Sequence, residues 1–429
     1  METPERRRCV LFATGSGPAQ RTPIFTLRPV ERTVLAFLRA GVREFLIAGD
    51  PEEARWVYAA LQEGPCRHAR VRVVENLAAA IGAGERVFLA ATDVHYDRRL
   101  VLRFVEETRA EGESAVAVDY RKDALEAHAG AARAAFWPGG ETLRMCAENL
   151  VGADAVLTGL ALVTPGFARA LVEEEPDKRS LGRALTALAQ REPVKPFSAF
   201  SLWQEVRGED DVAIARRKVL AGTVGVSDGI ISSYLNRPIS RRITERLLSS
   251  AVKPWHISVA TFVWTLGAAL AFAMGHGLVG GLLAQFASVL DGVDGEVARI
   301  RYQDSPFAGV YDAILDRVGE AWLIGGMTIW AWSMGAGQSA IALGFGAVAG
   351  SSLSMLVKEK YGTQFRRRYA DEHEGRARWL LLGRDGRLFL ALVAGVTGQV
   401  EVVLAYLAVG THLQAGARVL RIRSEAAGA

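Results

Sequence analysis

Cysteine is scarce in this chain of 429 residues: Cys9, Cys66 and Cys146 all lie in the first half, without close spacing. That pattern argues against a disulfide framework or a zinc knuckle, and it suits a reducing, cytoplasmic compartment. A strong charge of one sign is also absent, because 51 basic and 47 acidic residues leave a formal net charge of +4. We expect no nucleic-acid partner. Residues 1–10 contain no long apolar core, so we expect no signal peptide.

Charged residues are almost missing from two long stretches of the second half. The stretch from Ile257 to Leu290 has no Asp, Glu, Lys or Arg, and the stretch from Val318 to Val357 has only Glu320. The first half, by contrast, is charged and mixed like a soluble domain. We therefore expect three parts: a cytoplasmic domain over 1–220, a linker with a juxtamembrane helix over 221–255, and a membrane domain over 256–429.

Four aspartates stand at the edges of these apolar stretches. Asp291 and Asp294 fall on one stripe of a helix at i and i+3. Asp312 and Asp316 share a face of the next helix at i and i+4. Acidic groups in such surroundings are costly unless a cation or a function requires them. Two carboxylates on each of two adjacent helices form an oxygen cage that suits Mg²⁺, so we predict a metal site here.

The residues beside the first two aspartates suit a phosphate ligand. Gly295 and Ala298 continue the same stripe and leave it bare, so that a ligand can approach the backbone. Arg299 adds a guanidinium fork that matches the geometry of phosphate. A metal-ion transporter that uses the carboxylates as its pathway is an alternative, but it gives these three residues no role.

The second half predicts an all-α domain with six membrane spans, of which the fifth is short and glycine-rich. A basic, amphipathic segment from Arg241 to Ser250 predicts a helix at the membrane surface just before them. The short connections on one side carry no Lys or Arg, so the basic clusters mark the cytoplasmic face of a multi-pass inner-membrane protein. The aspartates lie near that face. The expected spans are 257–275, 278–298, 310–333, 338–358, 386–397 with its flanks, and 399–417.

The first half alternates strand-like and helical segments. Helical periodicity separates apolar runs that begin at Cys9, Glu44, Val71, Arg86 and Ala115. This alternation predicts an α/β domain with a parallel sheet and a Rossmann-like fold. Ligands in such sheets bind at the carboxyl ends of the strands, where the loop 15–17 and Asp93 fall.

This half resembles the sugar-phosphate nucleotidyltransferase (MobA-like) family. The matching pieces are Trp203 and three others: the glycine-rich loop through Arg21, Pro23, and Thr158-Gly159. Two departures stand beside them. The family's Lys before the Pro is Thr22, and its closing Trp-x-Asp-x-Asp metal element reads Trp203-Gln-Glu205-Val-Arg207. A cation in place of a metal-binding carboxylate argues against nucleotide transfer, so we expect a degenerate domain.

The second half resembles the CDP-alcohol phosphotransferase family. The signature of that family is Asp-x-x-Asp-Gly-x-x-Ala-Arg, a short gap, and Gly-x-x-x-Asp-x-x-x-Asp. The chain matches the first part at 291–299, and it matches both aspartates of the second part at Asp312 and Asp316. The departure is Ala308, where the pattern has Gly. The resemblance covers residues 228–423.

The resemblance implies an enzyme that moves a substituted phosphate from a CDP-alcohol to an alcohol acceptor and releases CMP. In such an enzyme two divalent ions, Mg²⁺ or Mn²⁺, hold the CDP pyrophosphate, and the last aspartate deprotonates the acceptor hydroxyl. The resemblance also implies a homodimer in the lipid bilayer. Carried over, Asp316 is a metal ligand and the general base, the other ligands are Asp291, Asp294 and Asp312, and the CDP pocket is lined by Asp291, Asp294, Gly295, Ala298 and Arg299.

Several donors and acceptors fit the resemblance. The domain order resembles the archaeal bifunctional inositol-phosphate cytidylyltransferase/di-myo-inositol-phosphate-phosphate synthases, in which the first domain makes CDP-inositol from CTP and the second uses it. Phosphatidylinositol-phosphate synthases share the membrane domain and use CDP-diacylglycerol. Arg384 and Arg387 flank the mouth of the fifth expected span, where they suit a phosphorylated acceptor such as inositol phosphate. The alternative role for these arginines is anchoring at the cytoplasmic face.

Overall fold

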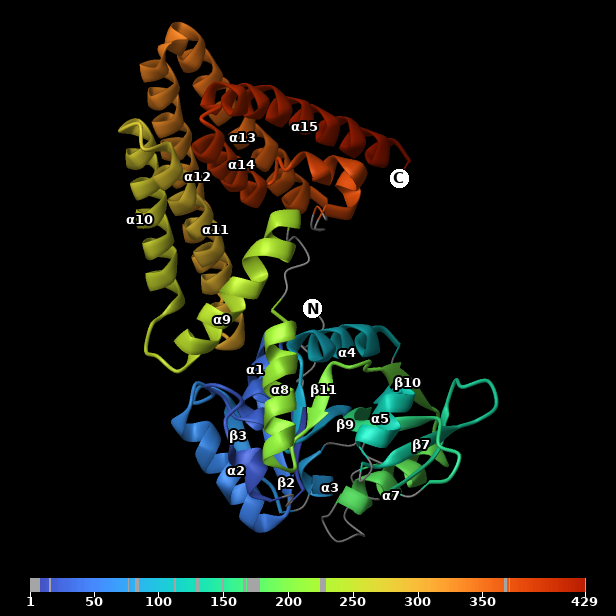
Figure 1. The fold of residues 1–429 in the computed structure, drawn as a ribbon. Helices are drawn as coiled ribbons and strands as arrows, with labels where there is room; N and C mark the ends of the chain where they lie inside the picture. Colours follow the sequence, from blue (N-terminus) through green and yellow to red (C-terminus); the bar gives the residue numbers. More distant parts are fainter. Residues whose placement is uncertain are drawn as a thin grey trace. The chain divides into compact units, whose positions relative to one another are not determined.

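The computed structural model describes residues 8–428 except 15, 16, 76, 82–84, 112, 129, 130, 149, 165, 166, 168–177, 224–228, 366–368 and 370. Gly15 and Ser16 of the predicted glycine-rich loop therefore lie outside the described residues. The chain divides into two compact units, Met1–Gly222 and Thr223–Ala429. The first unit is coloured blue to green in Figure 1, and the second unit yellow-green to red.

The described part of the first unit forms a nine-stranded sheet, which confirms the expected α/β fold. Seven strands are hydrogen-bonded in the order β10-β6-β9-β4-β1-β2-β3, and β7 and β8 extend the sheet from β9. A separate two-stranded sheet pairs β5 with β11. The strands are β1 Arg8–Ala13, β2 Glu44–Gly49, β3 Arg70–Val73, β4 Val87–Ala91, β5 Val94–Tyr96, β6 Ser114–Asp119, β7 Arg133–Phe136, β8 Leu143–Ala147, β9 Ala155–Val163, β10 Val194–Ser198 and β11 Trp203–Glu205.

The sheet is mixed, whereas the sequence predicted a parallel one. β1 runs parallel to β2 and β4, and β10 runs parallel to β6. β9, however, is antiparallel to β4, β6 and β7. Antiparallel neighbours such as β7 and β8 need only a short connection, so no crossover helix signals them in the sequence.

Helices cover the sheet because each presents an apolar face to it. α2 begins where Asp50 accepts a hydrogen bond of 2.8 Å from the backbone N–H of Glu53, a normal N-cap. α2 packs on β2 and β3, and α7 packs on β8. The helices of this unit are η1 Pro18–Arg21, α1 Pro29–Arg39, α2 Pro51–Glu63, α3 Leu77–Ala80, α4 Arg98–Glu111, α5 Lys122–Ala127, α7 Lys178–Ala189 and α8 Glu209–Ala221.

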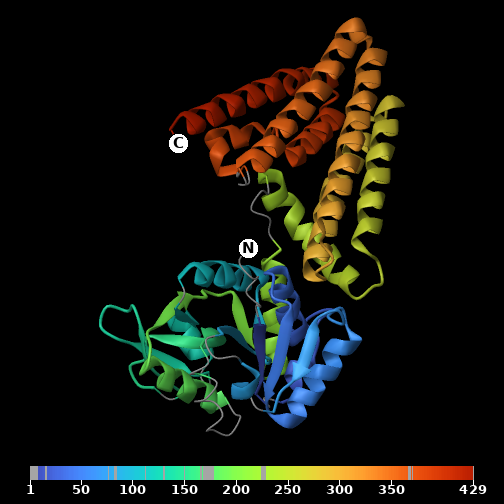
Figure 2. The ribbon, with the colours of Figure 1, turned by 180° about the vertical axis from the view of Figure 1, so that it is seen from behind.

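The second unit is helical throughout its described part (Figure 2). α10 packs on α11 and α12, α11 packs on α14, and α13 packs on α15. A π-helical turn joins α12 to α13. Gly335 lies within this turn and Gly337 follows it directly, and both have positive φ. The helices are η2 Ser232–Asn236, α9 Arg237–Leu248, α10 Pro254–Ala273, α11 Gly277–Ile300, α12 Pro306–Ala331, η3 Trp332–Ala336, α13 Gly337–Phe365, η4 Asp371–Leu380, α14 Arg384–Thr397 and α15 Val400–Gly428.

Small residues let these helices approach each other closely. A Cβ added at Gly326 of α12 would strike the backbone of Ala269 on α10. A Cβ at Gly281 of α11 would strike the backbone of Leu392 on α14. Such contacts are typical of helices packed in lipid. Three helical stretches among the described residues are long and apolar enough to cross a membrane: Pro254–Ala273, Pro306–Phe365 and Val400–Ala426.

Candidate active site

Three of the four predicted aspartates converge between α11 and α12. One carboxylate oxygen from each of Asp291, Asp294 and Asp312 lies within 4.8 Å of the other two. α11 supplies the first two side chains and α12 supplies the third, as the helical spacing of the sequence indicates. Oxygen atoms this close repel one another unless a cation lies between them, and hard cations prefer such ligands. The three residues therefore fit a divalent metal ion.

Asp294 is the most firmly oriented of the three. Its side chain is buried, Oδ2 accepts a hydrogen bond of 2.6 Å from Ser258 Oγ, and Oδ1 accepts one of 2.5 Å from the backbone N–H of Gly295. Ser258 belongs to α10, so a third helix fixes this carboxylate. Partners of this kind hold metal ligands in position. Sequence reasoning assigned no role to Ser258, because the contact joins residues far apart in the chain.

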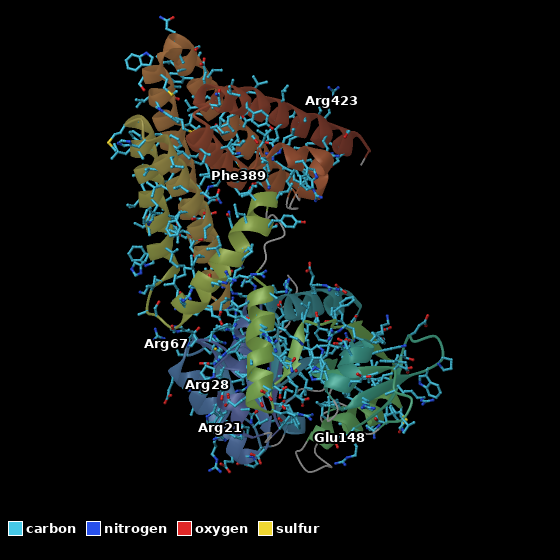
Figure 3. All side chains as sticks on the ribbon, in the orientation of Figure 1. Arg21, Arg28, Arg67, Glu148, Phe389 and Arg423 are labelled. Carbon is cyan, nitrogen blue, oxygen red and sulfur yellow. The ribbon has the colours of Figure 1, made fainter. Side chains whose placement is uncertain are left out.

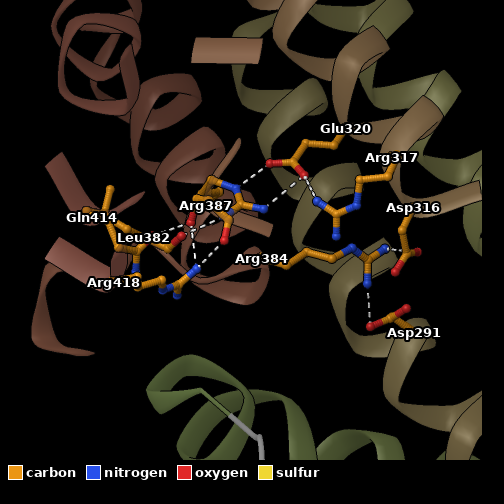
Figure 4. A network of polar contacts seen from close by, with 10 residues as sticks. Asp291, Asp316, Arg317, Glu320, Leu382, Arg384, Arg387, Gln414 and Arg418 are labelled. Carbon is orange, nitrogen blue, oxygen red and sulfur yellow. Dashed lines mark hydrogen bonds and ion pairs between the residues drawn. The ribbon is translucent and has the colours of Figure 1, made fainter. Parts of the chain in front are cut away.

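Asp316 lies beside this group rather than within it. Arg384 Nη2 is 2.6 Å from Asp316 Oδ1, and Arg384 Nη1 contacts Asp291 Oδ2 (Figure 4). Arg384, at the start of α14, thus links the fourth aspartate to the group of three. It neutralises part of the negative charge that the four neighbouring carboxylates would otherwise concentrate.

A cavity of about 660 Å³ opens at the aspartates. This volume is typical of pockets that hold a ligand the size of a nucleotide. Its described lining includes Asp291, Asp294, Gly295 and Asp312. Cationic side chains from six helical elements line it as well, which suits a ligand with several phosphate oxygens; they are Arg237, Arg299, Lys358, Arg378, Arg384, Arg387 and Arg418.

The predicted CDP-pocket residues lie at different depths. Gly295 lines the cavity, and a Cβ there would come within 2.9 Å of Arg299 Nη1, so the glycine leaves room for that guanidinium. Arg299 also lines the cavity and donates a hydrogen bond of 2.9 Å to the carbonyl oxygen of Thr223. Ala298 is buried, and the described residues of the cavity lining do not include it.

Arg387, predicted to bind the acceptor, lines the cavity but holds a carboxylate of the protein itself. Its Nη2 donates to Glu320 Oε2 at 2.9 Å, and its Nε contacts Glu320 Oε1. Its Nη1 donates to the carbonyl oxygen of Leu382 at 2.6 Å. Glu320 is the one charge in the apolar run 318–357. An isolated charge in an apolar run is the sequence feature that could have identified Glu320 as a residue with a specific role.

Glu296, a variable position of the signature, anchors α9 to α11. Its carboxylate is fully buried and accepts hydrogen bonds from Arg237 at 2.5 Å, Ser240 at 2.8 Å and Thr244 at 2.6 Å. All three donors belong to α9. Because Glu296 lies two residues after Asp294, it points away from the metal group and toward this neighbouring helix.

The first unit has a much smaller cavity at the predicted nucleotide end of its sheet. Its volume is about 50 Å³, and Asp93, Gly159, Trp203 and Glu205 are among its lining residues. Trp203 is fully buried, stacks on His128, and donates a hydrogen bond of 2.9 Å from Nε1 to Asp119. A cavity of this size holds one or two water molecules.

In the closing element of the first unit, Arg207 stands where the nucleotidyltransferase pattern has a metal-binding carboxylate, and this arginine forms an ion pair. Arg207 Nη2 lies 2.8 Å from Glu205 Oε1, so the guanidinium pairs with one of the carboxylates that line the small cavity. Behind it, Lys218 Nζ donates to the carbonyl oxygen of Trp203 at 2.7 Å. Burial lowers the pKa of Lys218 to about 8.

Comparison with known proteins agrees with this geometry. The model of the CDP-alcohol phosphatidyltransferase family matches residues 253–414, a range that contains all four aspartates. The second unit is therefore a CDP-alcohol phosphotransferase, a class of enzyme that transfers substituted phosphate groups. This match confirms the predicted resemblance and favours phosphate transfer over metal transport.

Relatives extend the similarity into the first unit. A bifunctional IPC transferase and DIPP synthase from Rubrobacter xylanophilus is 32% identical over 345 residues, which cover 76% of this chain and 75% of that protein. Its counterpart from Aquifex aeolicus is 28% identical over 274 residues, 63% of this chain and 62% of that protein. The 345-residue alignment is longer than the whole second unit. The chain belongs to the family of bifunctional IPC transferases and DIPP synthases.

Other similarities cover a smaller share of the chain. An archaetidylinositol phosphate synthase from Methanothermobacter thermautotrophicus is 31% identical over 102 residues, 23% of this chain and 52% of that protein. The solved structure of an inositol-1-phosphate CTP transferase from T. maritima covers 50% of this chain and 96% of its own, with 16% identity and a TM-score of 0.41.

Proposed function

We propose that the second unit transfers a substituted phosphate from a CDP-alcohol to the hydroxyl group of a polyol phosphate such as inositol phosphate. The observation that carries this proposal is the convergence of Asp291, Asp294 and Asp312 at a cavity rich in cations. Carboxylates would hold metal ions there, and the surrounding arginines and Lys358 would bind phosphate oxygens.

The metal site would hold two ions, Mg²⁺ or Mn²⁺, through Asp291, Asp294, Asp312 and Asp316. Bound there, the ions would neutralise the pyrophosphate of the donor and stabilise the charge of the leaving group. Ser258 keeps Asp294 oriented for this task through its hydrogen bond of 2.6 Å. Gly295, Ala298 and Arg299 would form the side of the pocket that receives the CDP group.

Asp316 would act as the general base. The acceptor oxygen forms a bond to the phosphorus nearer the alcohol of the donor, its proton passes to the Asp316 carboxylate, and the bond from that phosphorus to the CMP oxygen breaks. CMP leaves with the electron pair of that bond. Arg384, which contacts Asp316, would hold the carboxylate toward the acceptor, while Arg384 and Arg387 border the space for the acceptor phosphate.

The chain would be a multi-pass protein of the inner membrane with its active site on the cytoplasmic side. In this arrangement α10 to α15 lie within the bilayer as six membrane segments, and α9 lies at its surface. The distribution of Lys and Arg supports this orientation. The domain limits would be 1–220, 221–255 and 256–429, and the membrane domain would form a homodimer.

CDP-inositol is the donor that we favour, because the alignment with the bifunctional relative spans both units. The experiment is CMP release by the purified full chain with Mg²⁺, in which CDP-inositol and CDP-diacylglycerol are each tested with inositol phosphate, inositol and glycerol phosphate. D316N should lose turnover. E401Q, which alters an exposed carboxylate of α15, should retain it. If no CDP-alcohol turns over with metal supplied, the proposal is wrong.

A second candidate function is synthesis of the CDP-alcohol by the first unit. The relative named for both activities aligns with part of this unit. The Glu205–Arg207 ion pair and the small cavity favour a degenerate unit instead. Pyrophosphate release from CTP and inositol phosphate by the full chain would establish the activity. Its absence, with transfer from supplied CDP-inositol intact, would assign the degenerate role.

A further inference from the structure

α14 is too short to find its depth in a bilayer by hydrophobic matching alone. It has 14 residues, Arg384–Thr397, and rises about 21 Å at 1.5 Å per residue. The hydrocarbon layer is about 30 Å thick. A segment this short is placed by its neighbours rather than by its length. Yet its first residue, Arg384, must meet Asp291 and Asp316 accurately.

Two ion pairs connect α14 to α12 in a ladder (Figure 4). α12 presents Asp316 and Glu320 one turn apart on the same face. α14 presents Arg384 and Arg387 three residues apart, also on one face. Arg384 contacts Asp316 at 2.6 Å, and Arg387 holds both oxygens of Glu320. Two parallel pairs fix the rotation of α14 as well as its depth, because a slip of one residue breaks both.

The Glu320–Arg387 pair, which lies farther from the three clustered aspartates than the Arg384–Asp316 pair, is almost completely buried. The Glu320 and Arg387 side chains are 6% and 2% exposed. Arg387 also donates to the Leu382 carbonyl oxygen, and Arg317 Nη1 lies 3.3 Å from Glu320. A buried charge that loses its partner is very unfavourable, so the pair resists separation. At the other end of α14, Gly395 lies against the backbone of Gly277 on α11, which limits tilting there.

We propose that Glu320 and Arg387 are positioning residues that fix the register of α14 against α12 and thereby present Arg384 to Asp316. This inference rests on the proposed function, in which Asp316 is the general base. Neither residue takes part in the chemistry. Without them, a displacement of about 1 Å at Arg384 would be enough to lower turnover by about 100-fold.

Variants can separate positioning from simple stability. E320Q leaves Arg387 without a charged partner and should lower both the melting temperature and kcat. The double variant E320L/R387M removes both charges and fills similar volume, so it should recover the melting temperature. However, the double variant lacks the ion pair that fixes the register of α14 against α12, so kcat should remain reduced. E401Q is the control for loss of a carboxylate outside the ladder.

The register itself can be measured by electron–electron distance spectroscopy between spin labels at Trp322→Cys on α12 and Val396→Cys on α14. Both side chains are exposed, and the three native cysteines are buried, so labels should attach to the introduced thiols. E320Q and E320L/R387M should broaden the distance distribution or shift its mean by about 1.5 Å or more, the rise of one helical residue. E401Q should give the wild-type distribution.

The kinetic result expected for E320L/R387M is a kcat reduced about tenfold or more with the KM for the CDP donor within about threefold of wild type. Wild-type distances together with wild-type kcat in this variant would overturn the proposal and leave the pair a stability element. If the wild-type chain turns over no CDP-alcohol, the proposed function fails, and the distances still decide whether the pair fixes the register.

Discussion

Replacement of Glu296 should destabilise the second unit more than any change at its surface. The carboxylate is fully buried and accepts three hydrogen bonds from α9, one of them from the Arg237 guanidinium. E296A removes the acceptor of all three and leaves Arg237, which is 7% exposed, without its ion pair. Breaking a buried ion pair by removing one partner costs about 3–5 kcal/mol.

For a unit of this size such a loss corresponds to a fall in melting temperature of about 6–20 °C. E296Q keeps the shape of the side chain and one acceptor oxygen, so its free energy of unfolding should fall by less, about 1–3 kcal/mol. The double variant R237M/E296M, which buries no unpaired charge, should recover much of the loss of E296A. The expected order of stability is therefore wild type, E296Q, E296A, with the double variant above E296A.

Calorimetric unfolding of the full chain in detergent is the assay. A second variant distinguishes the unfolding transitions of the two units. W203A removes a fully buried side chain of the first unit and should shift the transition of that unit, whereas E296A should shift the transition of the second. A melting temperature for E296A within about 2 °C of wild type would refute the reasoning, since a loss of 1 kcal/mol already shifts it by that much. An E296Q variant less stable than E296A would refute it too.

Three further predictions follow from the described contacts. S258A should weaken Mn²⁺ binding by about 10- to 100-fold and D294N should weaken it further, as measured by titration calorimetry; wild-type affinity in S258A would show that Ser258 does not orient the ligand. G326L should lower the stability of the second unit by about 1–3 kcal/mol, whereas G325L, which faces open space, should not; equal melting temperatures would exclude close packing of α10 on α12. Burial raises the pKa of Cys66 and of Cys146 to about 12, so both thiols stay protonated at pH 8, and mass spectrometry should find no alkylation before unfolding; rapid labelling of the folded chain would contradict their burial.

The convergence of three aspartates was predictable because helix geometry converts spacing into position. Asp291 and Asp294 at i and i+3, and Asp312 one helix later, carry enough local information to place three oxygen ligands together. The apolar stretches around them supplied the second part of the prediction, because charges in such surroundings mark function. Neither step required knowledge of how distant helices pack.

The partners of these charges could not be predicted in the same way. Ser258 reaches Asp294 across 36 residues, and Arg387 reaches Glu320 across 67. Such contacts depend on which helices lie side by side, and no spacing rule within one helix encodes that. The antiparallel strand β9 was missed for a related reason, since its pairing with β4 and β6 is a tertiary choice rather than a local preference.

Carboxylates near the apolar stretches of the second unit thus serve two tasks with the same chemistry. Asp291, Asp294 and Asp312 face the cavity, where Arg384 offsets only part of their negative charge and a bound cation would offset the rest. Glu296 and Glu320 face neighbouring helices, where arginines offset their charge permanently. An isolated charge in an apolar run therefore indicates that something must neutralise it, but it does not say whether the neutralising group is a ligand or another helix. Arg384 joins the two tasks, because it touches the aspartates of the site and starts the helix that the Glu320–Arg387 pair holds in place.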